Sequence, residues 1–132
     1  MIAVRTFVLA LTLVMVGCAS APTAESGRSG RDANLLTAEE IERVHYNNVY
    51  ELVQALRPSW IQGRGRVSIQ DPTAGEAVVY VDGMRFGGVG QLRQLRTADV
   101  ASIQHLSAGD ASSRFGLDHA GGAILVHSKR GG

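Results

Sequence analysis

A single cysteine, Cys18, is present among the 132 residues, and this limits how the chain can be stabilised. One thiol cannot form a disulfide within the chain, so the covalent crosslinks of many small exported domains are excluded. Sixteen glycines favour tight turns over long regular helices. We therefore expect one small domain that depends on a packed apolar core.

The first 17 residues have the pattern of an export leader. Arg5 supplies a positive charge, and the run from Phe7 to Val16 is apolar over ten residues, shorter than the roughly 20 that span a membrane. The segment Met15-Val16-Gly17-Cys18 then places a small residue before the cysteine, which resembles the lipobox of bacterial lipoproteins. That resemblance implies cleavage before Cys18 and acylation of its thiol and amine, which together would form a stable membrane anchor.

The leader and the residue after Cys18 also predict where the protein is located and what net charge the mature chain carries. Ala19 lacks the acidic side chain that often retains such lipoproteins in the inner membrane, so the resemblance implies a lipid anchor in the outer membrane, facing the periplasm. The alternative is an incidental thiol beside an ordinary secretory signal. Loss of Arg5 with the leader leaves 12 basic and 12 acidic side chains, which disfavours a nucleic-acid partner.

Three segments are predicted along the chain. Residues 1–17 form the lipoprotein signal peptide, residues 18–36 the lipidated cysteine and a flexible tether, and residues 37–132 the folded domain. The tether is assigned because the residues from Ala19 onward are small and polar and show no hydrophobic period, so they would bury too little surface to offset the entropy of ordering.

Two helices are predicted at the start of the folded domain. Thr37 and Glu40 form a capping-box pattern before a short helix over about residues 38–44. Asn47 or Asn48 caps a second helix, which Pro58 ends. The apolar face of this second helix consists of Val49, Leu52, Val53 and Leu56.

The rest of the domain has the pattern of strands separated by glycine-rich turns. The four predicted strands are Arg66–Gln70, Ala77–Val81, Ala101–Leu106 and Gly122–Ser128. Between them we expect a turn at Asp82-Gly83, a glycine-rich turn over 87–90, a helical turn over 91–95, and a short helix over 110–115. The fold class is therefore α+β, with a small mixed β-sheet of about four strands and short helices.

Five short motifs in this region carry a family resemblance. They are Val81-Asp82-Gly83, Asp99 to Ile103, Ala111 to Gly116, Gly121 to Ile124, and Ser128 to Gly131. In order and near spacing they resemble the second half of the plug domain of TonB-dependent outer-membrane receptors, and the residues from Leu35 to Pro58 resemble its first segment. The resemblance covers about Leu35 to Gly131 and implies a plug-like fold.

Departures from the family pattern shape the functional expectation. The receptors continue into a barrel and this chain ends where the barrel would start, so we expect no transport by this chain alone. Ser107-Ala108-Gly109 stands where the family has Lys-Gly-Pro, and the tether contains no convincing TonB box. Coupling to TonB and uptake of a siderophore or cobalamin are therefore not carried over to this chain.

Enzymatic signals are weak in this sequence. The four histidines, His45, His105, His119 and His127, lack a paired metal-ligand spacing. Asp110, Ser112 and His119 come without a nucleophile elbow, and the glycines at 87–90 do not match a phosphate-binding loop. We expect no catalytic residue, metal or cofactor.

Three functions remain from different classes. The favoured one is a non-enzymatic interaction module that binds an envelope protein; the alternatives are a small-ligand-binding protein of the periplasm and an enzyme with an unrecognised site. The ligand or partner would contact loops at 84–90 and 117–120. The candidate residues in these loops are Met84, Arg85, Phe86, Leu117, Asp118 and His119.

Overall fold

The computed structural model of the chain describes residues 32–63 and 75–131. Cys18, the leader and the strand expected over Arg66–Gln70 lie outside these residues. Among the helices that are described, none combines the length and the apolar character needed to cross a membrane.

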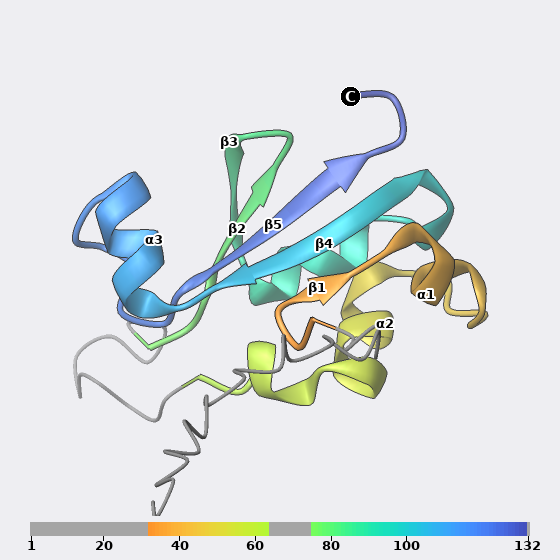
Figure 1. Cartoon of the computed structure of the whole chain (residues 1–132), viewed down its shortest axis with the longest axis horizontal. Helices are drawn as coiled ribbons and strands as arrows, with labels where there is room; N and C mark the ends of the chain where they lie inside the picture. Colours follow the sequence, from red (N-terminus) through yellow and green to blue (C-terminus); the bar gives the residue numbers. More distant parts are fainter. Residues whose placement is uncertain (1–31, 64–74, 132) are drawn as a thin grey trace, which may run out of the picture. The chain divides into compact units, whose positions relative to one another are not determined.

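Within the described residues, a five-stranded mixed sheet forms the centre of the domain (Figure 1). Its strands are β1 (Leu35–Leu36), β2 (Val78–Val81), β3 (Met84–Gly88), β4 (Val100–Leu106) and β5 (Ala123–Ser128). Their order across the sheet is β1-β4-β5-β2-β3, with β2 and β5 parallel and the other neighbours antiparallel. The expected α+β class and mixed sheet are confirmed.

Strand β1 corrects the predicted end of the tether. Leu35 and Leu36 were assigned to the tether, yet they pair with Gln104 and Ile103 of β4, and Leu36 is fully buried. A strand of two residues is too short to show an alternating pattern in the sequence. The ordered domain therefore begins before Thr37.

Strand β3 corrects a second prediction, because Met84 to Gly88 were expected in a loop. The dipeptide Asp82-Gly83 has backbone φ angles of 48° and 84°, which suit a two-residue hairpin turn that leads straight from β2 into β3. The register of the hairpin shifts between Val79 and Tyr80, so Phe86 is an extra residue in β3. This bulge removes the regular alternation by which a strand is recognised.

The predicted helix starts agree closely with the structure. The Thr37 hydroxyl accepts a hydrogen bond from the Glu40 amide and the Glu40 carboxylate accepts one from the Thr37 amide, so α1 (Ala38–Glu42) begins with the expected capping box. Asn48 caps α2 (Val49–Leu56) by accepting a hydrogen bond from the Glu51 amide. Pro58 opens a 3₁₀ turn, η1 (Pro58–Trp60), after the end of α2.

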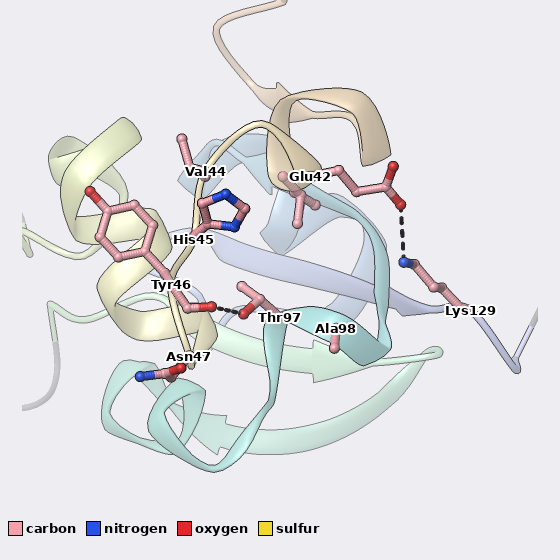
Figure 2. Close-up of a pocket in the computed structure, with 9 residues that line it drawn as sticks. Glu42, Val44, His45, Tyr46, Asn47, Thr97, Ala98 and Lys129 are labelled. Carbon is pink, nitrogen blue, oxygen red and sulfur yellow. Dashed lines mark hydrogen bonds and ion pairs between the residues drawn. The ribbon is translucent and has the colours of Figure 1, made fainter.

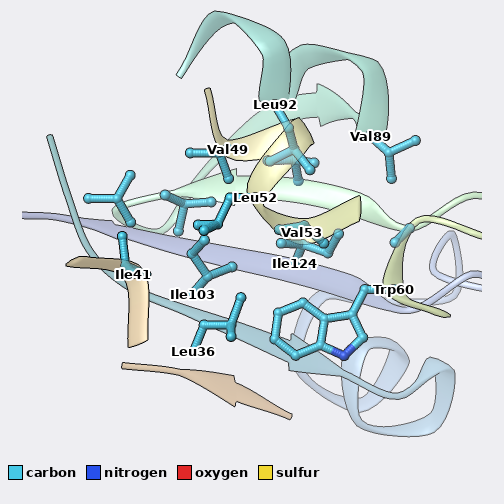
Figure 3. Packing of buried hydrophobic residues seen from close by; sticks show 14 residues of the cluster. Leu36, Ile41, Val49, Leu52, Val53, Trp60, Val89, Leu92, Ile103 and Ile124 are labelled. Atoms are coloured by element: carbon cyan, nitrogen blue, oxygen red, sulfur yellow. The ribbon is translucent and has the colours of Figure 1, made fainter. Parts of the chain in front are cut away.

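Two apolar clusters lie on opposite faces of the sheet. The larger one joins the sheet to α1, α2, η1 and a second 3₁₀ helix, η2 (Val89–Gln94), and Figure 3 shows Leu52, Ile103, Ile124 and Trp60 within it. The smaller one consists of Val78, Tyr80, Ala111, Ala123 and Leu125. Successive residues of β2 and β5 thus face different clusters, which explains why these strands are apolar throughout.

Helix α3 (Ala108–Phe115) covers part of the second face. It was expected over 110–115, but the Ser107 hydroxyl accepts a hydrogen bond from the Asp110 amide, which allows the helix to begin at Ala108. Gly116 ends it with a φ of 102°. A third 3₁₀ turn, η3 (Thr97–Asp99), leads into β4.

Candidate functional site

The six candidate residues fall into two groups on either side of Tyr80. Arg85 is the cross-strand partner of Tyr80 in the hairpin, and Met84 and Phe86 flank it on β3. The other three residues lie in the loop that follows α3, where His119 contacts the Tyr80 hydroxyl. The structure therefore places residues from both predicted loops beside Tyr80.

Hydrogen bonds fix His119 in one form. Its Nδ1 lies 2.8 Å from the Gly116 carbonyl oxygen, and its Nε2 lies 2.8 Å from the Tyr80 hydroxyl oxygen. A carbonyl can only accept, so Nδ1 carries a proton and Nε2 accepts from Tyr80 when the imidazole is neutral. Because His119 is 3% exposed and both nitrogens are engaged, it holds the loop against β2 and offers no nitrogen to a ligand.

Aromatic stacking also holds the loop after α3 and the end of α3 against Tyr80. The rings of Tyr80 and Phe115 are stacked with centroids 4.1 Å apart, and the His119 ring lies 5.9 Å from that of Tyr80. The Arg114 guanidinium lies 5.2 Å from the centre of the Phe115 ring. Helix α3, the following loop and β2 are therefore joined by both apolar and polar contacts.

Large apolar side chains are exposed on β3 and in the loop after α3. Met84 is 72% exposed, Phe86 is 40% exposed and Leu117 is 92% exposed. Strand β3 is the last strand of the sheet order, and no described residue pairs with its outer edge. This edge, formed by Met84 to Gly88 and called the β3 edge below, combines exposed apolar side chains with open backbone groups.

Asp82 connects two of the motifs found in the sequence. Its carboxylate accepts hydrogen bonds from the Ser128 backbone amide at 2.8 Å and from the Ser128 hydroxyl at 2.7 Å. The Gly131 amide in turn donates to the Ser128 hydroxyl. The Asp-Gly motif thus holds the Ser-Lys-Arg-Gly segment after β5, so both motifs have a structural role here.

These hydrogen bonds predict an acid-dependent loss of stability. The hydroxyl and then the amide of Ser128 lower the pKa of Asp82 below its ordinary value of 3.8. A carboxyl whose pKa is lowered by folding stabilises the folded state above its unfolded pKa, and this contribution disappears as the pH falls through the folded pKa. We expect Asp82→Asn to lower the urea midpoint at neutral pH, with a difference from wild type that shrinks below pH 3.8.

The matched control is Asp118→Asn, which removes an exposed carboxylate that accepts no hydrogen bond from another described residue. Its urea midpoint should follow that of the wild type at every pH. A constant difference between Asp82→Asn and wild type down to the most acidic sample would contradict the assigned role of the Asp82 carboxylate.

Two cavities lie away from the candidate residues. The cavity in Figure 2 has a volume of about 310 Å³ and lies between the α1–α2 connection and η3, beside the ion pair of Glu42 with Lys129 at 3.1 Å. The Thr97 hydroxyl donates to the Tyr46 carbonyl at its wall. The second cavity, of about 330 Å³, adjoins the stacked rings of Trp60 and His105.

Neither cavity shows an arrangement of groups typical of catalysis. His45 lines the first cavity and His105 lines the second. Within residues 32–63 and 75–131, no three His, Cys, Asp or Glu side chains are grouped so that they could hold a metal ion. The exposed β3 edge is therefore the feature that best fits a functional surface.

Comparison with known proteins yields one match. The model of the TonB-dependent receptor plug domain family matches residues 28–123, which is most of the chain and extends from before β1 to the first residue of β5. No curated protein and no solved structure matches the chain. The matched range agrees with the resemblance carried by the sequence motifs.

Proposed function

The chain belongs to the family of TonB-dependent receptor plug domains, and from this membership we propose that it is a membrane-tethered, non-enzymatic module that binds a partner protein in the cell envelope. The observation that carries this proposal is the β3 edge. Among the described residues, it is the exposed surface on which open strand groups and large apolar side chains occur together.

Several properties of the β3 edge support protein binding. An unpaired edge strand can accept a further strand, because its outward backbone groups lack partners in the sheet. Met84 and Phe86 would add apolar contact area, and their exposure would otherwise be unfavourable. Arg85 lies between them and forms no ion pair with another described residue, so its guanidinium is available to a partner.

Membrane tethering is supported by the sequence around Cys18. The lipobox-like segment and the leader before it imply acyl chains on this cysteine, and the family consists of domains of outer-membrane receptors. We therefore place the module on the periplasmic side of the outer membrane. The lipid would keep the domain close to other envelope proteins and raise their effective concentration.

One experiment tests the anchor and the binding surface together. A photo-crosslinking amino acid replaces Met84 in the full-length protein in its host, either alone or together with Cys18→Ser. We expect the first protein to carry acyl mass, to sediment with outer membranes and to form a discrete crosslinked product. With Cys18→Ser, we expect loss of the acyl mass, release from the membrane or absence of cleavage, and a weaker product.

The control places the same photo-crosslinking group at Glu39, which is 75% exposed on α1, a helix that contacts β4. Equal products from both positions would contradict a specific β3 surface. Identical fractionation of the two Cys18 forms as soluble protein would contradict the lipid anchor. The absence of any product from position 84 would favour the alternative, a small-ligand-binding protein of the periplasm.

A further inference from the structure

We propose that the partner of the β3 edge is a second copy of this chain, and that two domains associate antiparallel about a two-fold axis through β3. This inference rests on the proposed function, because it names the partner of the same surface. The paired β3 strands would join two five-stranded sheets into one continuous sheet.

The arrangement of the sheet favours β3 over the opposite edge. At that opposite edge, β1 is only two residues long, so it offers few backbone groups to another strand. Strand β3 has five residues, and Figure 1 shows it on the outer side of β2. It is therefore the longer of the two edges and the one at which another strand can pair.

Charges at the two ends of β3 are opposite and self-complementary. Arg85 lies near its beginning, whereas the Glu76 carboxylate lies beside Gly88 at its end: Glu76 Oε2 is 3.5 Å from where a Cβ on Gly88 would be. Neither charge forms an ion pair with another described residue. An antiparallel second copy would bring Arg85 of each domain towards Glu76 of the other, whereas a parallel copy would bring like charges together.

The apolar residues fit the same arrangement. Phe86 lies at the middle of β3, so a two-fold axis there would bring the Phe86 rings of both copies together. Met84, which is 72% exposed, would lie near the Gly87-Gly88 end of the other strand. One surface thus supplies both partners of each contact, as a two-fold interface requires.

The interface is small, which makes membrane tethering important. Five residues per strand bury less than a standard interface, and the bulge at Phe86 interrupts regular pairing. We therefore expect association to depend on the high local concentration that a shared membrane provides.

Disulfide trapping in membranes tests this proposal. Phe86→Cys is made in the full chain, and oxidised membranes are compared on non-reducing gels with wild type, which shows any background from Cys18, and with Leu117→Cys, whose side chain is 92% exposed away from β3. We expect a disulfide-linked dimer from Phe86→Cys only. Adding Arg85→Glu should remove most of this dimer, and adding Arg85→Glu with Glu76→Arg should restore it.

The variant with both Arg85→Glu and Glu76→Arg also controls for misfolding. It still carries Arg85→Glu, so recovery of the dimer would show that this substitution does not act by unfolding the domain. The proposal of a second copy as partner would be overturned if Phe86→Cys gave no more disulfide-linked dimer than Leu117→Cys. It would also be overturned if the charge reversals left the amount of dimer unchanged. In that case a photo-crosslinked product from position 84 with the mass of another protein would leave the proposed function standing. Loss of both signals would overturn both.

Discussion

Alanine in place of Gly122 is expected to destabilise the domain more than any other change considered, and alanine in place of Gly121 is expected to destabilise it as well. A Cβ on Gly121 would overlap the backbone carbonyl of Glu76, and one on Gly122 would overlap the Leu106 carbonyl oxygen. Gly122 also has a φ of 84°, which is strained for alanine. Strain of this kind and overpacking each cost roughly 1–3 kcal/mol, so we expect a loss of about 2–5 kcal/mol for Gly122→Ala, which has both, and about 1–3 kcal/mol for Gly121→Ala, which has the overlap alone.

The surrounding backbone has little freedom to relax. The Val78 amide donates to the Gly122 carbonyl at 3.1 Å, which joins the segment to the start of β2. Urea unfolding followed by circular dichroism measures the loss. The control is Gly109→Ala in α3, where the nearest atom to an added Cβ is Ser107 Oγ at 3.9 Å, and alanine should stabilise the helix by roughly 0.5–1 kcal/mol.

Equal urea midpoints for Gly121→Ala and Gly109→Ala would contradict this account. If the glycine variants lose stability as expected, the Gly-Gly-x-Ile motif has a conformational role, because it allows β5 to begin close to the segment that leads into β2. The hydrogen bonds between Asp82 and Ser128 also have a structural role, because they hold the chain at the end of β5.

The motifs that identify the family therefore describe how the sheet is assembled. They do not include Met84, Phe86 or Glu76, on which the proposed binding surface depends. Family membership here predicts the fold, while the partner has to be inferred from the exposed edge.

Sequence patterns predicted the central part of the fold well. The runs in β2 and β5 are apolar at consecutive positions because each strand lies between the two clusters, and this pattern is visible in the sequence without a structure. The caps at Thr37 and Asn48 were predictable because capping depends on residues three positions apart.

Other features of the fold could not be predicted, because no pattern of neighbouring residues in the sequence indicates them. Strand β3 was missed because its bulge and its two glycines remove the alternation of a strand, and β1 was missed because it is two residues long. The Glu76 and Arg85 charges belong to the same edge only because the hairpin folds back at Asp82-Gly83. Contacts of this kind depend on the register of the sheet, which the sequence alone does not specify.

The contact between Tyr80 and His119 is a further case, since 39 positions separate the two residues. His119 was predicted to contact a ligand or partner because it lies at 117–120, one of the two loops assigned to binding. In the folded domain the loop turns inward, and the imidazole is buried against β2. Its contribution is therefore expected to appear in stability measurements.

Tyr80→Phe is expected to lower the free energy of unfolding by about 1–3 kcal/mol, the usual cost of leaving a buried polar atom without its partner. The change removes only the hydroxyl that donates to His119 Nε2, and the stacked Phe115 can keep its place. The control is Tyr50→Phe, because the Tyr50 ring contacts Arg93 at 3.8 Å and its hydroxyl has no hydrogen-bond partner among the described residues. Tyr50→Phe should therefore change stability little.

A double-mutant cycle with His119→Leu separates the hydrogen bond from packing. Removing both polar partners should cost less than the sum of the two single changes, because no buried acceptor is then left unpaired. Urea unfolding of the four proteins gives the coupling energy between Tyr80 and His119. Strict additivity, or equal losses for Tyr80→Phe and Tyr50→Phe, would show that the hydrogen bond does not hold the loop, and that packing of Phe115 against Tyr80 alone keeps α3 on the sheet.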